Sequence, residues 1–465
     1  MQNLEIDRDK LIDKLAGKTI TVFMLLACCS LLVALLAGVL GSIYYTSSYE
    51  IMQKLNLSFQ TLRPLHTGGA GGWIYLAAVA FVLDFLFQRL KQRGAGGPSL
   101  EKVQAHVHLL IGLWALAGLL ALVTLPLGIF SGREYVGFHP AISLLILAGW
   151  LVFASLFFRI NGFSLRNQPV YIWMWATGLG LFVYSFCEAH AYLLDYLTRA
   201  PVRDLAVQWK SYGTLVGSFN LLVYGSLMYL GERGGDKTYA HSKLAFFFFF
   251  LGILNSLTNY GHHTYHLPQS IWVKWISFTV SMTEIIILFK ILLDLFSLKK
   301  VRAQFKSQPA LAMLLVSVTI WTFLQLIVAL LISVPPINTL FHGTHVILAH
   351  SMGSMVGIDT MALLATAAFM FAVHHGNETS RFTRFAPAAV VSFNLSLFVL
   401  WVTLVWIGVR SGIRLYLDGV LPRASLFPDY MGPVFLGAGI ILSLSLFVLL
   451  VPWLGKLGQA LSRKS

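Results

Sequence analysis

Apolar stretches of membrane-spanning length recur along the whole chain and constrain its fold more than any other feature. Twelve of them reach about 20 residues, the length that crosses a bilayer as an α-helix. Only 11% of the 465 residues are charged and 57% are hydrophobic, so we expect no soluble domain between them. The sequence predicts an all-α integral membrane protein in which residues 1–465 form one domain. The predicted segments are roughly 20–44, 64–90, 104–130, 139–159, 170–197, 205–231, 243–266, 270–297, 309–333, 339–373, 386–410 and 431–455.

Basic residues are distributed unevenly among the connections between these segments. With the N-terminus inside, the inner connections and both tails hold most of the 33 Lys and Arg residues, as the positive-inside rule requires. The formal net charge of +14 therefore indicates topology and affinity for anionic lipid headgroups, and it does not predict nucleic-acid binding. We expect a multi-pass protein of the bacterial inner membrane with both termini in the cytoplasm and the lipid bilayer as its surroundings.

Histidines enter three of the apolar segments from the outer side. His66 lies at the start of the second segment, His262 and His263 at the end of the seventh, and His350 inside the tenth. A single buried histidine is usually structural, but four at a common depth favour a haem or metal site on facing helices. Met352 follows His350 by two residues, so on a helix these two side chains point about 200° apart.

Six sequence segments together identify a family. The set resembles the large catalytic subunit of bacterial cytochrome c-dependent nitric oxide reductase, in the haem–copper oxidase superfamily. The resemblance implies a twelve-helix bundle of the haem–copper oxidase subunit I type. It also implies a respiratory oxidoreductase that receives electrons from a membrane-anchored cytochrome c subunit and reduces a small gas such as nitric oxide. The segments are LRPLHTGGAGGWIYLAAVA (62–80), SGREY (131–135), NQPVYIWMWATG (167–178), NYGHHTYH (259–266), SMTEII (281–286) and PPINTLFHGTHVILAHSMG (335–353).

The same resemblance implies two b-type haems near the outer face. His350 corresponds to the ligand of the high-spin haem, and His66 to one ligand of the low-spin haem. The family has a second histidine where this chain has Met352. A thioether also ligates haem iron and raises its reduction potential relative to a second histidine, whereas the alternative is a packing methionine. His342 and His345 are expected either to cap the helix or to bind haem propionates.

The non-haem iron site of the family is altered in this chain. The family uses an adjacent histidine pair, matched here by His262 and His263, plus a histidine and a glutamate on the sixth helix. The sixth segment here contains neither, and alignment puts Tyr212 at the position of the missing histidine. Bound non-haem iron is therefore uncertain from sequence. Glu284 matches a family glutamate near the active site, so it is either a proton-handling carboxylate or a structural hydrogen-bonding group.

The outer connection that contains SGREY leaves two interpretations open. By resemblance Glu134 is a candidate calcium ligand, and the alternative is a surface ion pair between Arg133 and Glu134. Arg63 is placed either to bind a haem propionate or to anchor the helix at the membrane interface.

Two further functions remain open from sequence. The missing ligands of the sixth segment favour a diverged, non-catalytic haem protein that binds gas, transfers electrons or assists assembly. A secondary transporter would also suit twelve segments, but the outward position of the histidines disfavours it.

Overall fold

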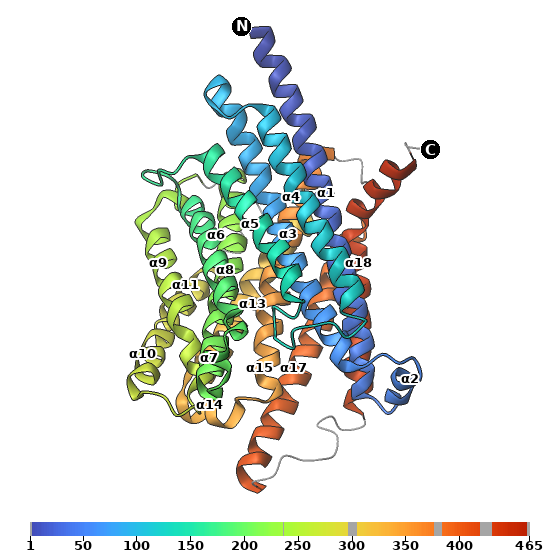
Figure 1. Cartoon of the computed structure of the whole chain (residues 1–465), viewed down its shortest axis with the longest axis vertical. Coiled ribbons are helices and arrows are strands. Elements are labelled where there is room, and N and C mark those ends of the chain that lie inside the picture. The colour runs from blue at the N-terminus through green and yellow to red at the C-terminus, as the bar shows by residue number, and fades with distance from the viewer. Residues whose placement is uncertain (1, 236, 296–304, 376–383, 419–429, 463–465) are drawn as a thin grey trace.

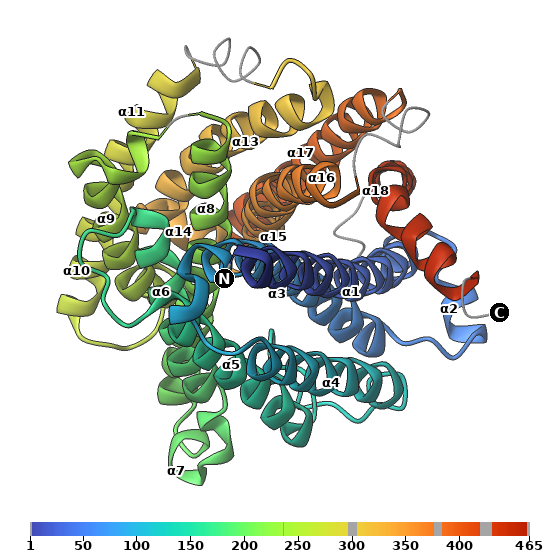
Figure 2. The same cartoon turned by 90° about the horizontal axis from the view of Figure 1, so that it is seen from above.

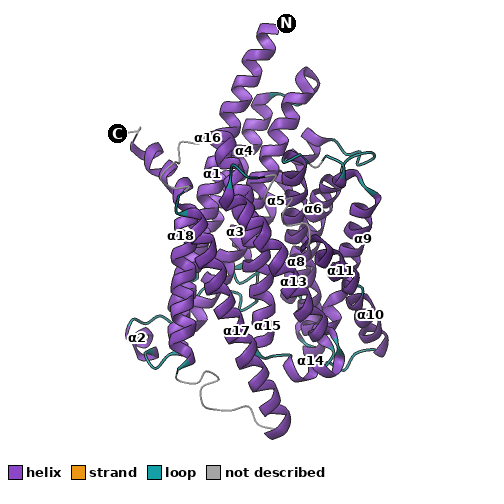
Figure 3. Ribbon diagram, turned by 180° about the vertical axis from the view of Figure 1, so that it is seen from behind, coloured by secondary structure: helices purple, strands orange, loops and turns teal. Residues whose placement is uncertain are grey.

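The protein is a bundle of membrane-spanning helices. The computed structural model describes residues 2–235, 237–295, 305–375, 384–418 and 430–462. Helices and loops make up these ranges, and no strand occurs in them (Figure 3). Twelve helical segments in the described part are long and apolar enough to cross a membrane. The predicted all-α, twelve-span architecture is therefore confirmed.

The two ends of the bundle differ in their connections. Both termini lie at one end, and the short helices α2 (Tyr49–Lys54) and α14 (Pro335–Phe341) lie at the opposite end (Figure 1). We call these the terminal end and the α14 end. The long helices are α1 (Gln2–Ser42), α3 (Phe59–Arg93), α4 (Leu100–Thr124), α5 (Pro140–Asn161), α6 (Val170–Ala189), α8 (Pro201–Arg233), α9 (Lys243–Thr258), α13 (Pro309–Ser333), α17 (Ala386–Asp418) and α18 (Met431–Ser462).

Two of the predicted segments are interrupted in the structure. The eighth breaks at Thr283, between α10 (Ile271–Met282) and α11 (Glu284–Leu295). The tenth consists of α15 (His345–Met352), a π-helical turn at Gly353–Thr360 and α16 (Met361–His375). Such π-helical turns are rare and are often found at functional sites.

The start of the tenth segment differs from the predicted boundary. Gly343 has a positive φ of 79° and separates α14 from α15. The Thr344 hydroxyl then caps α15 by accepting a hydrogen bond from the Val346 N–H at 3.3 Å. The side chains of His342 and His345 therefore do not provide the N-cap that was one of their predicted roles.

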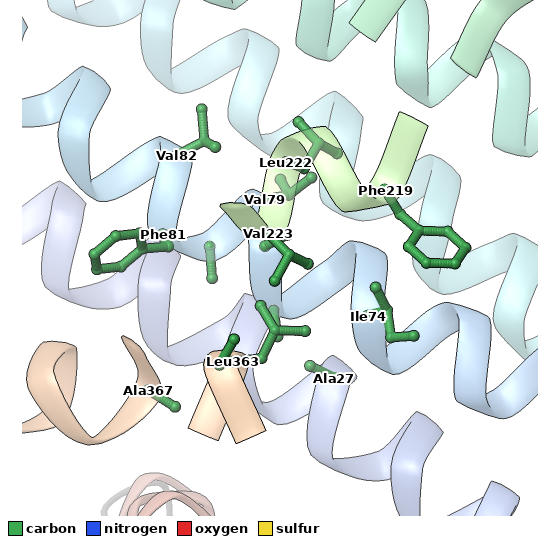
Figure 4. Packing of buried hydrophobic residues seen from close by; sticks show 14 of the residues in the cluster. Ala27, Ile74, Val79, Phe81, Val82, Phe219, Leu222, Val223, Leu363 and Ala367 are labelled. Atoms are coloured by element: carbon green, nitrogen blue, oxygen red, sulfur yellow. The ribbon is translucent and has the colours of Figure 1, made fainter. Parts of the chain in front are cut away.

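Helix α3 lies at the centre of the hydrophobic core. Seen from the terminal end, α1 and α3 run side by side, with α15 and α16 next to them (Figure 2). Side chains of α3 interdigitate with those of α8 and α16, as Phe81, Val223 and Leu363 illustrate (Figure 4). A Cβ on Gly69 would lie 2.8 Å from the Ser30 carbonyl oxygen of α1. Glycine therefore permits the close helix contact that stabilises bundles in lipid.

We expect Gly408→Leu to destabilise the protein, because α17 packs against the backbone of α15 at this point. A Cβ on Gly408 would lie 2.3 Å from the Val346 backbone nitrogen, which cannot move independently of the helix. Overpacking of this kind lowers the free energy of unfolding by about 1–3 kcal/mol or more. Thermal unfolding of the detergent-solubilised protein measures the effect. Gly439→Leu on α18 is the matched control, because nothing lies within 4 Å of its Cβ position, and equal losses in the two variants would contradict the packing argument.

Candidate functional site

His66 is held against α1 by a backbone hydrogen bond. Its Nδ1 lies 2.8 Å from the carbonyl oxygen of Ala34. The ring fits there because α1 has Gly38, whose Cβ would otherwise lie 2.7 Å from Nδ1. A carbonyl acceptor at Nδ1 fixes the proton on that nitrogen and leaves Nε2 as the atom that can ligate a metal. The side chain of His66 remains exposed despite its place in the bundle.

His350 and Met352 point to different sides of α15. The Nδ1 atom of His350 lies 2.5 Å from the side-chain nitrogen of Gln325 on α13. Met352 instead packs against a small cluster formed by Ala349 of α15 with Leu404 and Ile407 of α17. His350 and Met352 therefore have different neighbours, Gln325 of α13 for the first and this cluster for the second.

These side chains are of the types that ligate haem iron. Within the described part of the chain, Nε2 of His66 and Nε2 of His350 have no hydrogen-bond partner. Nδ1 of His66 donates to the Ala34 carbonyl, which leaves Nε2 free to ligate, whereas the Gln325 amide nitrogen is a donor and makes Nδ1 of His350 an acceptor. Ligation through Nε2 of His350 therefore requires the Gln325 amide to present its oxygen to Nδ1. Met352 packs against a cluster that Tyr45, in the turn after α1, also borders, and His66 is bonded to α1 itself. If His66 and Met352 ligate one haem, His350 is left to ligate another through Nε2.

The histidine pair lies in a 3-10 turn, Asn259–Thr264, at the α14 end of α9. Nε2 of His262 and Nε2 of His263 are 3.0 Å apart. His262 also contacts the Ser281 hydroxyl through Nδ1, at 3.3 Å. The ring centroid of His263 lies 6.2 Å from that of His342, so the structure brings the seventh and tenth predicted segments together.

Trp209 is the α8 side chain that contacts this pair. Its indole stacks on His263 with ring centroids 4.7 Å apart and an angle of 5° between the planes. The alignment of the sequence had placed Tyr212 at this position. The structure instead puts the Tyr212 ring 5.3 Å from Tyr135 and its hydroxyl 3.2 Å from Gln208. Trp209 and Tyr212 lie three residues apart and differ by about 60° in direction around the helix, which separates their contacts.

His342 joins the cluster from the turn before α15. Its ring centroid lies 4.4 Å from that of His266 and 5.8 Å from that of Trp209. Burial, followed by the neighbouring His266, lowers the pKa of His342 to about 4. His342 is therefore neutral near pH 7 and its Nε2 is buried without a hydrogen-bond partner. The motif HGTH identified His342 as a candidate residue, but the sequence did not predict that it lies beside His263.

The cluster does not fit the ligand set of the family's non-haem iron. Within the ranges that the structure describes, no group of three or more His, Cys, Asp or Glu side chains is arranged to hold one metal ion. His262 and His263 supply two imidazoles, and the Trp209 indole of α8, which stacks on His263, is not a metal-ligating group. We therefore assign no chemical step to a non-haem metal.

The outer loop forms two ion pairs that differ from the predicted one. Glu134 pairs with Arg63 at 2.8 Å, and Arg133 pairs with Asp204 at 3.0 Å. The expected pair between Arg133 and Glu134 is therefore wrong: their side chains point to different helices. Because the Glu134 carboxylate already has a cationic partner, a calcium ion there would have to compete with Arg63.

Two buried aspartates were missed by the sequence reasoning. Asp84 of α3 is 1% exposed and pairs with His374 of α16 at 2.7 Å. Asp359 lies in the π-helical turn and is 0% exposed. Each is a lone acidic residue inside an apolar run, and charge in such a run is the signal that would have identified it. Glu284, which was identified, lies at the break between α10 and α11.

An apolar cavity lies beside the candidate haem residues. It has a volume of about 370 Å³ and is bounded by α1, α3, α4, α5, α6 and α8. Met355, three residues after Met352, lines it together with Tyr75 and the glycines of the GGAGG segment. Small uncharged gases partition favourably into apolar space of this kind.

Comparisons with known proteins agree with this architecture. A solved structure of a haem–copper terminal oxidase dimer superimposes with a TM-score of 0.72 over 95% of this chain and 84% of that chain, at 16% identity. The cbb3-type cytochrome c oxidase subunit CcoN1 of Stutzerimonas stutzeri is 23% identical over 314 residues. This chain spans 64% of the length of that relative, and the match covers 64% of this chain.

The family assignment rests on a match over most of the sequence. The family model described as "Cytochrome C and Quinol oxidase polypeptide I" matches residues 18–439. The haem–copper oxidase superfamily predicted from the motifs is thus confirmed, while the named relatives are oxidases and not nitric oxide reductases. This chain belongs to the cytochrome c and quinol oxidase polypeptide I family, the subunit I family of haem–copper oxidases.

Proposed function

We propose that this chain is the haem-bearing subunit of a respiratory oxidoreductase in a bacterial inner membrane and that it reduces a small gas. The observation that carries the proposal is that the two candidate ligands on α15 have different neighbours, since His350 contacts Gln325 of α13 and Met352 packs against Leu404 and Ile407 of α17. His66 and Met352 would hold a low-spin haem b, and His350 a high-spin haem b. Such haems supply one-electron transfer and an iron with an open position for a gas.

The protein's own residues would orient the haem ligands and supply protons to the gas site. Ala34 and Gln325 orient the imidazoles of His66 and His350 through their Nδ1 atoms. Arg63 lies near the α14 end, where it would neutralise the charge of a haem propionate. It would then either release the Glu134 carboxylate or bind both carboxylates. Glu284 is the candidate proton-handling carboxylate. A membrane-anchored cytochrome c subunit docking at the α14 end would supply electrons.

Nitric oxide is the substrate that the sequence motifs favour. Two molecules of nitric oxide, two electrons and two protons give nitrous oxide and water, so the site must accept electrons and protons together. The six matching segments resemble the nitric oxide reductase branch, whereas the relatives found by comparison are oxidases. Oxygen is therefore the competing substrate.

A non-catalytic haem protein is the second candidate function. It is favoured by the sixth segment, which lacks the His and Glu ligands of the resembled branch, and by Trp209 of α8, which stacks on His263. Such a protein would bind gas or transfer electrons without turnover.

Gas consumption by the purified, haem-containing chain tests the proposal. With a chemical reductant, we expect anaerobic consumption of nitric oxide that falls at least about a hundredfold in His350→Ala. His106→Ala is the control, because His106 is a half-buried histidine bonded to its own helix, away from the candidate site. Oxygen consumption alone would identify an oxidase, and reducible haem with neither activity would establish the non-catalytic function.

The iron-to-haem ratio of the same preparation tests the non-haem centre. About three irons for two haems would mean that His262 and His263 hold iron despite the altered α8. Two irons for two haems would agree with the incomplete ligand set seen at the pair.

A further inference from the structure

Asp359 is a carboxyl group buried at the middle of its membrane span. It lies in the π-helical turn between α15 and α16, about halfway along the span His345–His375. The residue is 0% exposed, and neither carboxyl oxygen has a hydrogen-bond partner among the described residues. Buried polar atoms without partners are rare in proteins, and they occur where a group has a role other than stability.

Close packing against α13 fixes the backbone that carries Asp359. Gly353 and Gly357 lie one turn apart and face Gln325 and Trp321, which are one turn apart on α13. A Cβ on Gly353 would lie 2.2 Å from the Gln325 side-chain oxygen, and one on Gly357 would lie 2.7 Å from the Trp321 ring. The extra residue of a π turn rotates the side chains of all later residues by about 100° around the helix axis. The direction of Asp359 is thus set by helix packing.

The contrast with Asp84 separates Asp359 from an ordinary structural aspartate. Asp84 is equally buried, but its carboxylate pairs with His374 at 2.7 Å. Within the described part of the chain, no cation pairs with Asp359. An unpaired buried carboxylate is so unfavourable that the group takes up a proton and becomes neutral. Asp359 therefore carries a proton in the membrane interior.

Asp359 lies on the inner side of the histidine cluster. It follows His350 by nine residues, or about 13 Å toward the terminal end at 1.5 Å per residue. Along the tenth span it therefore lies between the terminal end and the histidines.

We propose that Asp359 stores and donates protons for the reaction at the histidine cluster. The proposal rests on the proposed gas reduction, which consumes one proton for each electron supplied by the donor. The O–H bond of Asp359 breaks as the proton leaves toward the gas site, and the carboxylate then regains a proton from the terminal end. The carboxyl group is unchanged over a complete turnover.

Infrared difference spectroscopy of the whole haem-containing chain tests this assignment without any gas substrate. Reduction of the protein is expected to change the carbonyl-stretching band of a protonated carboxylic acid, and the band is expected to shift in D₂O. Asp359→Asn and Asp359→Leu should both abolish it. Leucine fills the site without an unpartnered polar group, so that variant is expected to fold even if the asparagine variant does not. Asp84→Asn is the control and should retain the band, because Asp84 is ion-paired.

The rate of proton uptake on reduction gives the second readout. We expect it to fall about a hundredfold in Asp359→Leu, as for loss of a general acid, and to recover in part in Asp359→Glu. A carboxylic acid band that survives in Asp359→Leu, or unchanged proton uptake, would overturn the proposal. Absence of gas consumption with the band present would overturn only the proposed function, and consumption with no such band would overturn only the role of Asp359.

Discussion

His66→Ala is expected to remove the low-spin haem. The substitution deletes one of its two axial ligands together with the Nδ1 bond to Ala34 that orients the ring. The purified variant should contain one haem per chain in place of two, and the optical bands of a six-coordinate low-spin haem should be lost. Haem content by pyridine haemochrome and the reduced-minus-oxidised spectrum measure both changes.

Two further variants show whether this loss is specific. Gly38→Ala places a Cβ 2.7 Å from Nδ1 of His66, so it should shift the same bands while leaving the ligand in the sequence. His106→Ala is the matched control, since that imidazole is bonded to the Lys102 carbonyl of its own helix and has no assigned role at a haem. An unchanged low-spin spectrum in His66→Ala would refute the assignment.

Met352→His is expected to lower the reduction potential of the low-spin haem. A thioether favours ferrous iron relative to imidazole, so a second histidine should stabilise the ferric state. We expect a shift of roughly 0.1 V, a fraction of the about 0.8 V range over which axial ligands set haem potentials. Spectroelectrochemical titration measures it. Met352→Ala should instead abolish the low-spin bands.

Met355 provides the control for this experiment. It lies three residues further along, lines the apolar cavity and packs in the core. Met355→His should leave the potential of the low-spin haem close to that of the unmodified protein. If Met352→His and Met352→Ala both leave the spectrum and the potential unchanged, Met352 is a packing residue and the His/Met assignment is wrong.

Hydrophobic patterning predicted the spans because each had to satisfy its backbone within a single helix. The same pattern could not show the break at Thr283 or the π turn at Gly353–Thr360, since both arise from packing between helices distant in sequence. Gly353 and Gly357 were visible as small residues, but their partners on α13 were not. The tertiary contact, and not the local sequence, determines where these helices depart from regular geometry.

The candidate site was predicted in part. Spacing alone placed His350 and Met352 on different sides of a helix, and the structure shows different neighbours for each. Alignment placed Tyr212 at the position of the missing histidine, and in the structure Tyr212 lies against Tyr135 while Trp209 stacks on His263. Asp359 was missed, although an acidic residue in an apolar run is a signal that could have identified it.

Haem content and ligation in the purified, unmodified chain test the account most directly. We predict two haems b per chain, of which one is low-spin and shows the near-infrared charge-transfer band of His/Met ligation by magnetic circular dichroism. The other should be high-spin and should bind carbon monoxide when reduced. A chain that contains no haem, or whose low-spin haem has two histidine ligands, would contradict the assignment of His66, Met352 and His350.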